Sequence, residues 1–184
     1  TGVAARHGIL IKDAEALELA HRINTVVFDK TGTLTDGTPH VVACVALKDP
    51  DPLGAKVPVE SYAADSSDRL EVLSIAASLQ AGSEHPLARA VLAEAMAASL
   101  APLPARSLQA LPGRGIAGEV ADETWWLGNR RLMAENSVST AALDGAAAEL
   151  EAAGRTVSWL ARSSDRHALG LLAFGDAVKP GAAA

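Results

Sequence analysis

The residues best suited to covalent chemistry form one segment, Asp29-Lys30-Thr31-Gly32-Thr33-Leu34-Thr35. The apolar run before it, residues 25–28, predicts a buried parallel strand. Asp29 would then lie at the carboxyl end of that strand, where open α/β sheets hold their ligands. The loop that follows is small and hydroxylated, so its N–H groups and hydroxyls could gather around a phosphoryl group. A carboxylate at this position could act as a nucleophile and become an aspartyl-phosphate.

The sequence D-K-T-G-T-L-T is the phosphorylation motif of P-type ATPases, and on this motif the chain resembles those cation pumps. The resemblance implies that Asp29 is the phosphorylated nucleophile and that Lys30 and Thr33 contact the phosphoryl group. It also implies a Mg²⁺ ion held by the Asp29 carboxylate and the Thr31 carbonyl. That site is expected to be incomplete here, because the family's later motifs, T-G-D and G-D-G-x-N-D, do not occur in the sequence.

A second group of candidate residues lies in the segment Ser83-Glu84-His85-Pro86-Leu87. Proline suits the first turn of a helix, so His85 is expected at a helix N-terminus. S-E-H-P-L resembles the His-Pro motif of heavy-metal P-type ATPases, whose histidine helps to place the adenine of ATP. The resemblance assigns Glu84 and His85 to nucleotide binding. Gln80 stands where the family has a glutamate, and its carbonyl can still accept a hydrogen bond from the adenine amino group.

The segment from Gly113 to Gly118 fits the pattern G-x-G-x-x-G. The pattern alone is a weak signal, and a strand rather than a long helix is expected after it, so a dinucleotide-binding fold is not indicated. In the heavy-metal pumps a G-x-G at this place lines the ATP pocket, and the resemblance assigns Gly113, Gly115 and Ile116 to that pocket. Gly128 and Asn129 match a further Gly-Asn element of the same pocket.

The elements expected around these groups are strands mixed with pairs of helices. Strands are predicted over residues 25–28, 40–47, 107–111, 116–121, 124–127, 156–161 and 167–174. Helices are predicted over residues 14–22, 68–80, 86–98, 130–135 and 141–153. A turn is predicted at residues 36–39 and a surface loop at 48–67. This order predicts an α+β domain with an antiparallel sheet flanked by helical hairpins, beside a partial haloacid dehalogenase-like α/β phosphorylation domain.

Asp176, Lys179 and Pro180 resemble the hinge at which the pump's chain returns from the nucleotide-binding domain. We therefore expect an N-terminal segment of the phosphorylation domain over residues 1–36 and a nucleotide-binding domain over residues 37–175. Residues 176–184 would form a truncated return hinge.

Composition restricts the classes of function that need to be considered. The formal net charge of −6 and the scattered basic residues argue against a nucleic-acid surface. Cys44 is the single cysteine, which excludes an intrachain disulfide and a thiolate metal cage and fits a reducing compartment. The sequence contains no run of about 18 apolar residues that could span a membrane. We therefore expect a soluble piece on the cytoplasmic side of a larger membrane protein, with the rest of the pump as its partner.

The leading hypothesis is the ATP-binding and phosphorylation region of a heavy-metal P-type ATPase, with ATP and Mg²⁺ as cofactors. Copper(I) export is preferred, because the runs at residues 8–12 and 127–129 resemble copper members. Zinc, cadmium or cobalt pumps are alternatives, since metal selectivity depends on transmembrane ligands. A haloacid dehalogenase-type phosphatase is a poor alternative, because Thr31 stands where those enzymes carry a second aspartate. The last alternative is a nucleotide-binding module without catalysis, and the chain alone is expected to be inactive or very weakly active.

Overall fold

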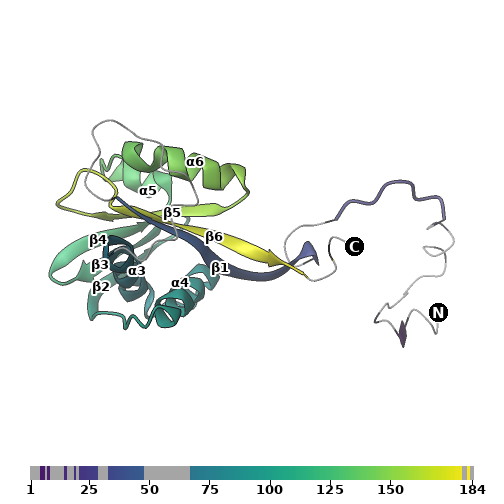
Figure 1. Ribbon diagram of the computed structural model, residues 1–184, viewed down its shortest axis with the longest axis horizontal. Coiled ribbons are helices and arrows are strands. Elements are labelled where there is room, and N and C mark those ends of the chain that lie inside the picture. The colour runs from purple at the N-terminus through teal and green to yellow at the C-terminus, as the bar shows by residue number, and fades with distance from the viewer. Residues whose placement is uncertain are drawn as a thin grey trace.

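The computed structural model describes residues 5–6, 8, 15, 19, 21–28, 33–47, 67–179 and 182. Most of these residues build one six-stranded antiparallel sheet with helices on both faces (Figure 1). The order of its strands is β1-β6-β5-β4-β3-β2. Their bounds are β1 Thr35–Ala46, β2 Ala105–Leu111, β3 Gly115–Val120, β4 Glu123–Gly128, β5 Thr156–Arg162 and β6 Gly170–Val178. The predicted α+β fold with an antiparallel sheet is therefore confirmed.

Two groups of helices cover the two faces of the sheet. The helical pair α3 (Ser67–Gln80) and α4 (Pro86–Ala97) covers one face, and α5 (Arg130–Glu135), the 3-10 turn η3 (Ala141–Leu143) and α6 (Asp144–Ala152) cover the other (Figure 1). The predicted helices over 68–80, 86–98 and 130–135 are confirmed, and the one over 141–153 is divided into η3 and α6. Within the described residues, no helix combines the length and the apolar character that a bilayer crossing requires.

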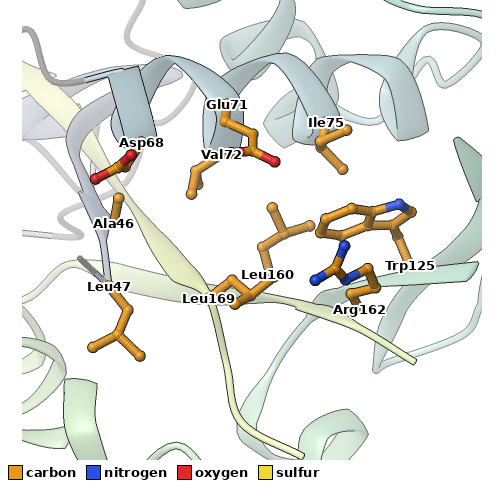
Figure 2. Close-up of a pocket in the computed structure, with 10 residues that line it drawn as sticks. All are labelled: Ala46, Leu47, Asp68, Glu71, Val72, Ile75, Trp125, Leu160, Arg162 and Leu169. Atoms are coloured by element: carbon orange, nitrogen blue, oxygen red, sulfur yellow. The ribbon is translucent and has the colours of Figure 1, made fainter. Parts of the chain in front are cut away.

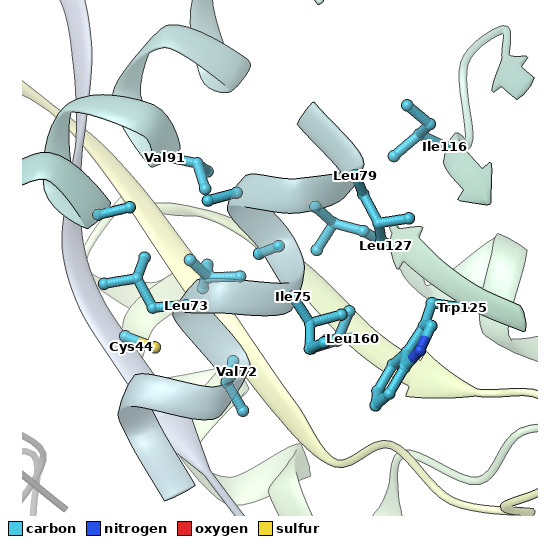
Figure 3. Packing of buried hydrophobic residues seen from close by; sticks show 14 of the residues in the cluster. Cys44, Val72, Leu73, Ile75, Leu79, Val91, Ile116, Trp125, Leu127 and Leu160 are labelled. Atoms are coloured by element: carbon cyan, nitrogen blue, oxygen red, sulfur yellow. The ribbon is translucent and has the colours of Figure 1, made fainter. Parts of the chain in front are cut away.

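The core has two parts because neighbouring strand residues point to opposite faces of the sheet. Leu160 of β5 belongs to the cluster under α3 and α4, whereas its neighbours Trp159 and Ala161 belong to the cluster under α5 and α6. Figure 3 shows the first cluster, in which the apolar side chains of α3 meet those of β3, β4 and β5. Helix α3 is buried over most of its circumference, since it lies between the sheet and α4.

The first strand begins earlier than the sequence predicts. β1 starts at Thr35, and residues 36–39, predicted to be a turn, instead form a bulge in this strand. The register against β6 shifts between Thr35 and Pro39, and Gly37 has a φ of 72°. The turn-forming residues thus keep their local conformation, while β6 supplies the pairing that makes the segment part of a strand.

The predicted buried strand at residues 25–28 is wrong for the chain as described. Residues 23–28 have no regular secondary structure, and Val26, Val27 and Phe28 are 64%, 90% and 63% exposed. A strand needs neighbours to pair its backbone N–H and C=O groups. No described strand lies beside this segment. Most of the predicted helix at 14–22 lies outside the described residues; residues 15 and 19 are helical and residues 21 and 22 form a turn.

Candidate functional site

The glycine turn, residues 113–115, connects β2 to β3 and lies directly against the end of β4. Gly115 is paired with Gly128 across the two strands. A Cβ atom on Gly115 would lie 2.1 Å from the carbonyl oxygen of Leu127, and one on Gly128 would lie 2.2 Å from that of Arg114. Gly113 has a φ of 68° and Gly115 a φ of 152°, both in the region that favours glycine. The backbones can approach this closely because neither paired residue carries a side chain.

Asn129 connects the glycine turn to α5. Its Nδ2 donates to the carbonyl oxygen of Gly113 at 2.8 Å, and its backbone N–H donates to that of Arg114 at 2.8 Å. Its Oδ1 accepts from the N–H of Leu132 at 3.1 Å, which makes Asn129 the N-cap of α5. Three of the residues predicted to bind nucleotide, Gly113, Gly115 and Gly128, are thus held together with Asn129 in one hydrogen-bonded unit.

His85 is the N-cap of α4, as the sequence predicts. Its Nδ1 accepts a hydrogen bond from the N–H of Leu87 at 3.2 Å, and the backbone N–H of His85 donates to Ser83 Oγ at 3.3 Å. Since Nδ1 is the acceptor, the proton of the neutral ring is on Nε2. The ring is exposed, and so is Glu84. His85 therefore presents an N–H donor and a ring face outside the protein core.

The junction between α3 and α4, residues 81–85, comes directly after the end of α3, which packs over β3 and β4. Leu79 lies beside Ile116 and Leu127 in Figure 3, and its Cδ2 is 3.1 Å from where a Cβ on Gly118 would lie. Gln80 is half-buried and ends α3. Ile116 is buried in the core cluster. No hydrogen bond or ion pair within the described residues joins the His85 group to the glycine turn.

The segment predicted to be phosphorylated is only partly described. Asp29, Lys30 and Thr31, and with them the predicted Mg²⁺ ligands, lie outside the described residues, as does Pro180. Thr33 is exposed and precedes β1. Among the described residues, no group of three or more His, Cys, Asp or Glu side chains could hold a metal ion.

At the predicted hinge, Asp176 of β6 binds the bulge of β1. Its carboxylate accepts hydrogen bonds from the Thr35 hydroxyl, from the N–H of Gly37 at 3.0 Å and from that of Thr38 at 3.1 Å. The Thr35 hydroxyl and then these two N–H groups hold the pKa of Asp176 below its usual value. Lys179 continues the contact between the strands, since its N–H donates to the carbonyl of Leu34 at 2.9 Å. β1 and β6 extend here beyond β5 as a two-stranded ribbon (Figure 1).

A cavity of about 170 Å³ lies on the α3 side of the sheet, away from the residues predicted to bind nucleotide (Figure 2). Val72 and Leu160 contribute to its apolar floor, and Glu71 faces Arg162 across it. None of the predicted nucleotide residues lines it. It is smaller than the roughly 300–1,000 Å³ of ordinary ligand pockets. We therefore do not assign the nucleotide to this cavity.

Comparison with known proteins identifies the family. A model of the haloacid dehalogenase-like hydrolases matches residues 23–184. The chain belongs to this family. One relative is the probable copper-transporting ATPase PacS of Synechococcus elongatus, which is 38% identical over 184 residues. The match covers 100% of this chain and 22% of PacS. A second relative is the probable copper-importing P-type ATPase A of Enterococcus hirae, 36% identical over 97% of this chain and 21% of the relative.

The crystal structure of a zinc-transporting PIB-type ATPase in its E2.Pi state is also similar, with a TM-score of 0.71 and 37% identity over 98% of this chain and 26% of that one. The haloacid dehalogenase-like chain thus corresponds to part of a heavy-metal P-type ATPase. It spans about a fifth of the length of the curated relatives that it matches.

Several contacts at these sites are not predicted from the sequence. Among them are the hydrogen bond that the Thr35 hydroxyl donates to Asp176 and the ion pair between Arg114 Nη1 and Glu135 Oε2 at 2.9 Å. Thr35 ends the D-K-T-G-T-L-T motif, which could have drawn attention to its hydroxyl. The ion pair joins a turn to a helix 21 residues later in the chain, and no local pattern indicates such a contact.

Proposed function

We propose that this chain is the ATP-binding and phosphorylation region of a heavy-metal P-type ATPase, in which Asp29 attacks the γ-phosphate of ATP. The observation that supports nucleotide binding best is the unit formed by the glycine turn, Gly128 and Asn129. Gly113 is exposed, and a Cβ on it would meet nothing within 4 Å, so a ligand can approach the turn closely at this residue. Gln80 at the end of α3 and the following residues Glu84 and His85 come directly after Leu79, which packs on Ile116 of β3 and Leu127 of β4.

In the proposed site, the exposed ring of His85 lies against the adenine, and the Gln80 carbonyl accepts from the adenine amino group. The glycine turn and Asn129 hold the rest of the nucleotide. Asp29 belongs to a separate segment, so a movement at the ribbon of β1 and β6 is required to bring the γ-phosphate to it. Asp176, Lys179 and Pro180 are the proposed hinge residues in this movement.

The Asp29 carboxylate and the Thr31 carbonyl are oxygen donors, which is the kind of ligand that Mg²⁺ binds. When bound, the ion would neutralise part of the charge on the transferred phosphoryl group. The chain's own contribution is to supply the nucleophile at Asp29, with Lys30 and Thr33 contacting the phosphoryl oxygens. Thr31 cannot act as a general base, so the aspartyl-phosphate would persist.

For the transported metal, we propose copper(I), because PacS is a probable copper-transporting ATPase and the Enterococcus hirae relative is a probable copper-importing one. Zinc is the second candidate, since the zinc-transporting structure matches at a similar identity. A transport assay of the full-length pump with each metal in turn would distinguish the two. Uptake of zinc but not copper into vesicles would refute the copper assignment.

Nucleotide binding is tested by titrating the chain with ATP, comparing wild type with His85→Ala. Loss of a stacked ring that also donates a hydrogen bond is expected to raise the Kd about tenfold. His167→Ala is the matched control, because His167 lies at the other end of the fold, in the connection between β5 and β6. Equal ATP affinity of wild type and His85→Ala would refute the proposed adenine site.

Phosphorylation is tested in the full-length pump with radiolabelled ATP. An acid-stable, hydroxylamine-sensitive phosphoenzyme is expected in the wild type and not in Asp29→Asn. If Asp29→Asn binds ATP normally and the wild type still forms no phosphoenzyme, the chain is a nucleotide-binding module without catalysis.

A further inference from the structure

Arg114 stands at the centre of the glycine turn and differs from its neighbours in having a long cationic side chain. Its backbone is fixed, because its carbonyl accepts the N–H of Asn129 at 2.8 Å and its own N–H donates to the carbonyl of Leu111 at 2.9 Å. Its side chain leaves the turn and is 34% exposed. The guanidinium is therefore attached to a rigid backbone but remains open to a ligand.

Glu135 of α5 holds this guanidinium in place. Arg114 Nη1 donates to Glu135 Oε2 at 2.9 Å, while Arg131 Nε donates to the other carboxylate oxygen at 2.8 Å. The Arg114 side chain, and after it that of Arg131, lowers the pKa of Glu135, so the carboxylate stays ionised at neutral pH. A guanidinium has five N–H donors in a planar fork, and the bond to Glu135 comes from one of its terminal nitrogens. The remaining donors can bind an oxyanion.

The charge at this place also favours an anion. Two guanidiniums share one carboxylate, so the group of Arg114, Arg131 and Glu135 carries a net positive charge. The neighbouring Arg130 does not change this balance, because it pairs with Asp144. The chain as a whole has a formal net charge of −6. A local positive group on an acidic protein attracts a polyanion to that part of the surface.

We propose that Arg114 binds the phosphate chain of the nucleotide and thereby makes the site prefer ATP to AMP, with Glu135 holding the guanidinium beside the glycine turn. Arginine is suited to this role, because its planar fork matches the oxygens of a phosphate. The inference rests on the proposed nucleotide binding and adds a residue that selects for the phosphates. It concerns the side chain between the two glycines, in addition to the backbone that the glycines expose.

The test measures the affinities of the wild type, Arg114→Ala, Arg114→Lys and Arg131→Ala for ATP, ADP and AMP by titration calorimetry. Arg114→Ala is expected to raise the Kd for ATP roughly five- to tenfold and that for AMP less than twofold, as for one charge-assisted contact that is partly open to solvent. Arg114→Lys should recover part of the loss, because it keeps the charge and loses the fork. Arg131→Ala removes one charge of the group and its ion pair to Glu135 but no proposed phosphate contact, so it should weaken ATP binding less than Arg114→Ala does.

Salt dependence gives a second readout, since a charge contact weakens as the ionic strength rises. The ATP affinity of Arg114→Ala should depend on salt less steeply than that of the wild type. An equal change in the affinities for ATP and AMP, or no change in either, overturns the role of Arg114 while leaving nucleotide binding intact. If the wild type binds none of the three nucleotides, the proposed function itself fails, and the Arg114 inference fails with it.

Discussion

Replacing Gly128 by alanine tests the close contact on which the candidate site depends. The new Cβ would lie 2.2 Å from the carbonyl oxygen of Arg114, 2.9 Å from Cα of Gly115 and 2.7 Å from Cδ2 of Leu132. Two of these atoms belong to the backbone of the neighbouring strand and its turn. They cannot rotate away as a side chain can, so β3 and β4 must separate, or the turn must move.

The size of the effect follows from these distances. An ordinary contact of a Cβ begins at 3.4 Å, so the Arg114 carbonyl must move by more than an ångström. Overpacking of this kind costs typically about 1–3 kcal/mol, and we expect about 3 kcal/mol because backbone is involved. For a domain of this size, that loss corresponds to a decrease in Tm of about 6–12 °C. The displaced turn should also weaken ATP binding at temperatures where the variant is fully folded.

The assay is urea and thermal unfolding followed by circular dichroism, with Gly145→Ala as the matched control. A Cβ at Gly145 meets nothing within 4 Å, and the residue lies in α6. Alanine there should stabilise the protein by about 0.5 kcal/mol through helix propensity. If Gly128→Ala unfolds at the same urea concentration as the wild type, the strands are not as close as described, and the steric reasoning is refuted.

Four further predictions concern other parts of the fold. The pKa of Asp176 is lowered, so its stabilising effect is present above the unfolded pKa of about 4 and is lost as the pH falls through the lower folded pKa. In urea unfolding from pH 7 to pH 2, Asp176→Asn should reduce the loss of stability at acidic pH. Identical pH profiles of the wild type and the variant would contradict the contact with Thr35. Leu73→Ala, at a fully buried position, should cost about 3 kcal/mol in urea unfolding. Asn129→Ala should cost about 1–2 kcal/mol through the lost N-cap and should weaken ATP binding in titration calorimetry. Burial raises the pKa of the Cys44 thiol to about 11, so it should resist iodoacetamide at pH 8 until urea unfolds the protein, as mass spectrometry would show.

The α+β domain could be predicted from the sequence because its local signals agree with its packing. His85-Pro86 marks the start of α4, and α5 spans the predicted residues Arg130–Glu135. The predicted strands of the hairpin between β3 and β4 differ from the observed ones by one residue at their ends, because the turn lies at Ala121 and Asp122, which both adopt a positive φ. The apolar run at 25–28 failed as a prediction because a buried strand needs neighbouring strands, and the composition of a segment does not show whether they are present.

For the candidate site, the sequence indicated the residue types but not the contacts between them. Glycines at 113, 115 and 128 were selected by resemblance, and the reason for two of them, the close approach of β3 to β4, needed the three-dimensional pairing. The role of Asn129 as a link to the turn could not be predicted either, since its partner Gly113 belongs to another hairpin. Long-range side-chain contacts have no local sequence signal, and this also explains why the pairing of Arg114 with Glu135 was missed.

The bulge in β1 shows how a distant side chain can change the meaning of a local signal. Residues 36–39 have turn chemistry, and Gly37 does adopt a positive φ, yet the segment continues as a strand. The N–H groups of Gly37 and Thr38 are turned away from the normal ladder and would lack acceptors there. Asp176 supplies them, from 138 positions further along the chain, and also accepts the hydroxyl of Thr35. The proposed domain boundaries at residues 36 and 176 thus lie on the two sides of one set of hydrogen bonds, so a movement of the proposed nucleotide-binding domain that separates β1 from β6 here must break the contacts of a single carboxylate.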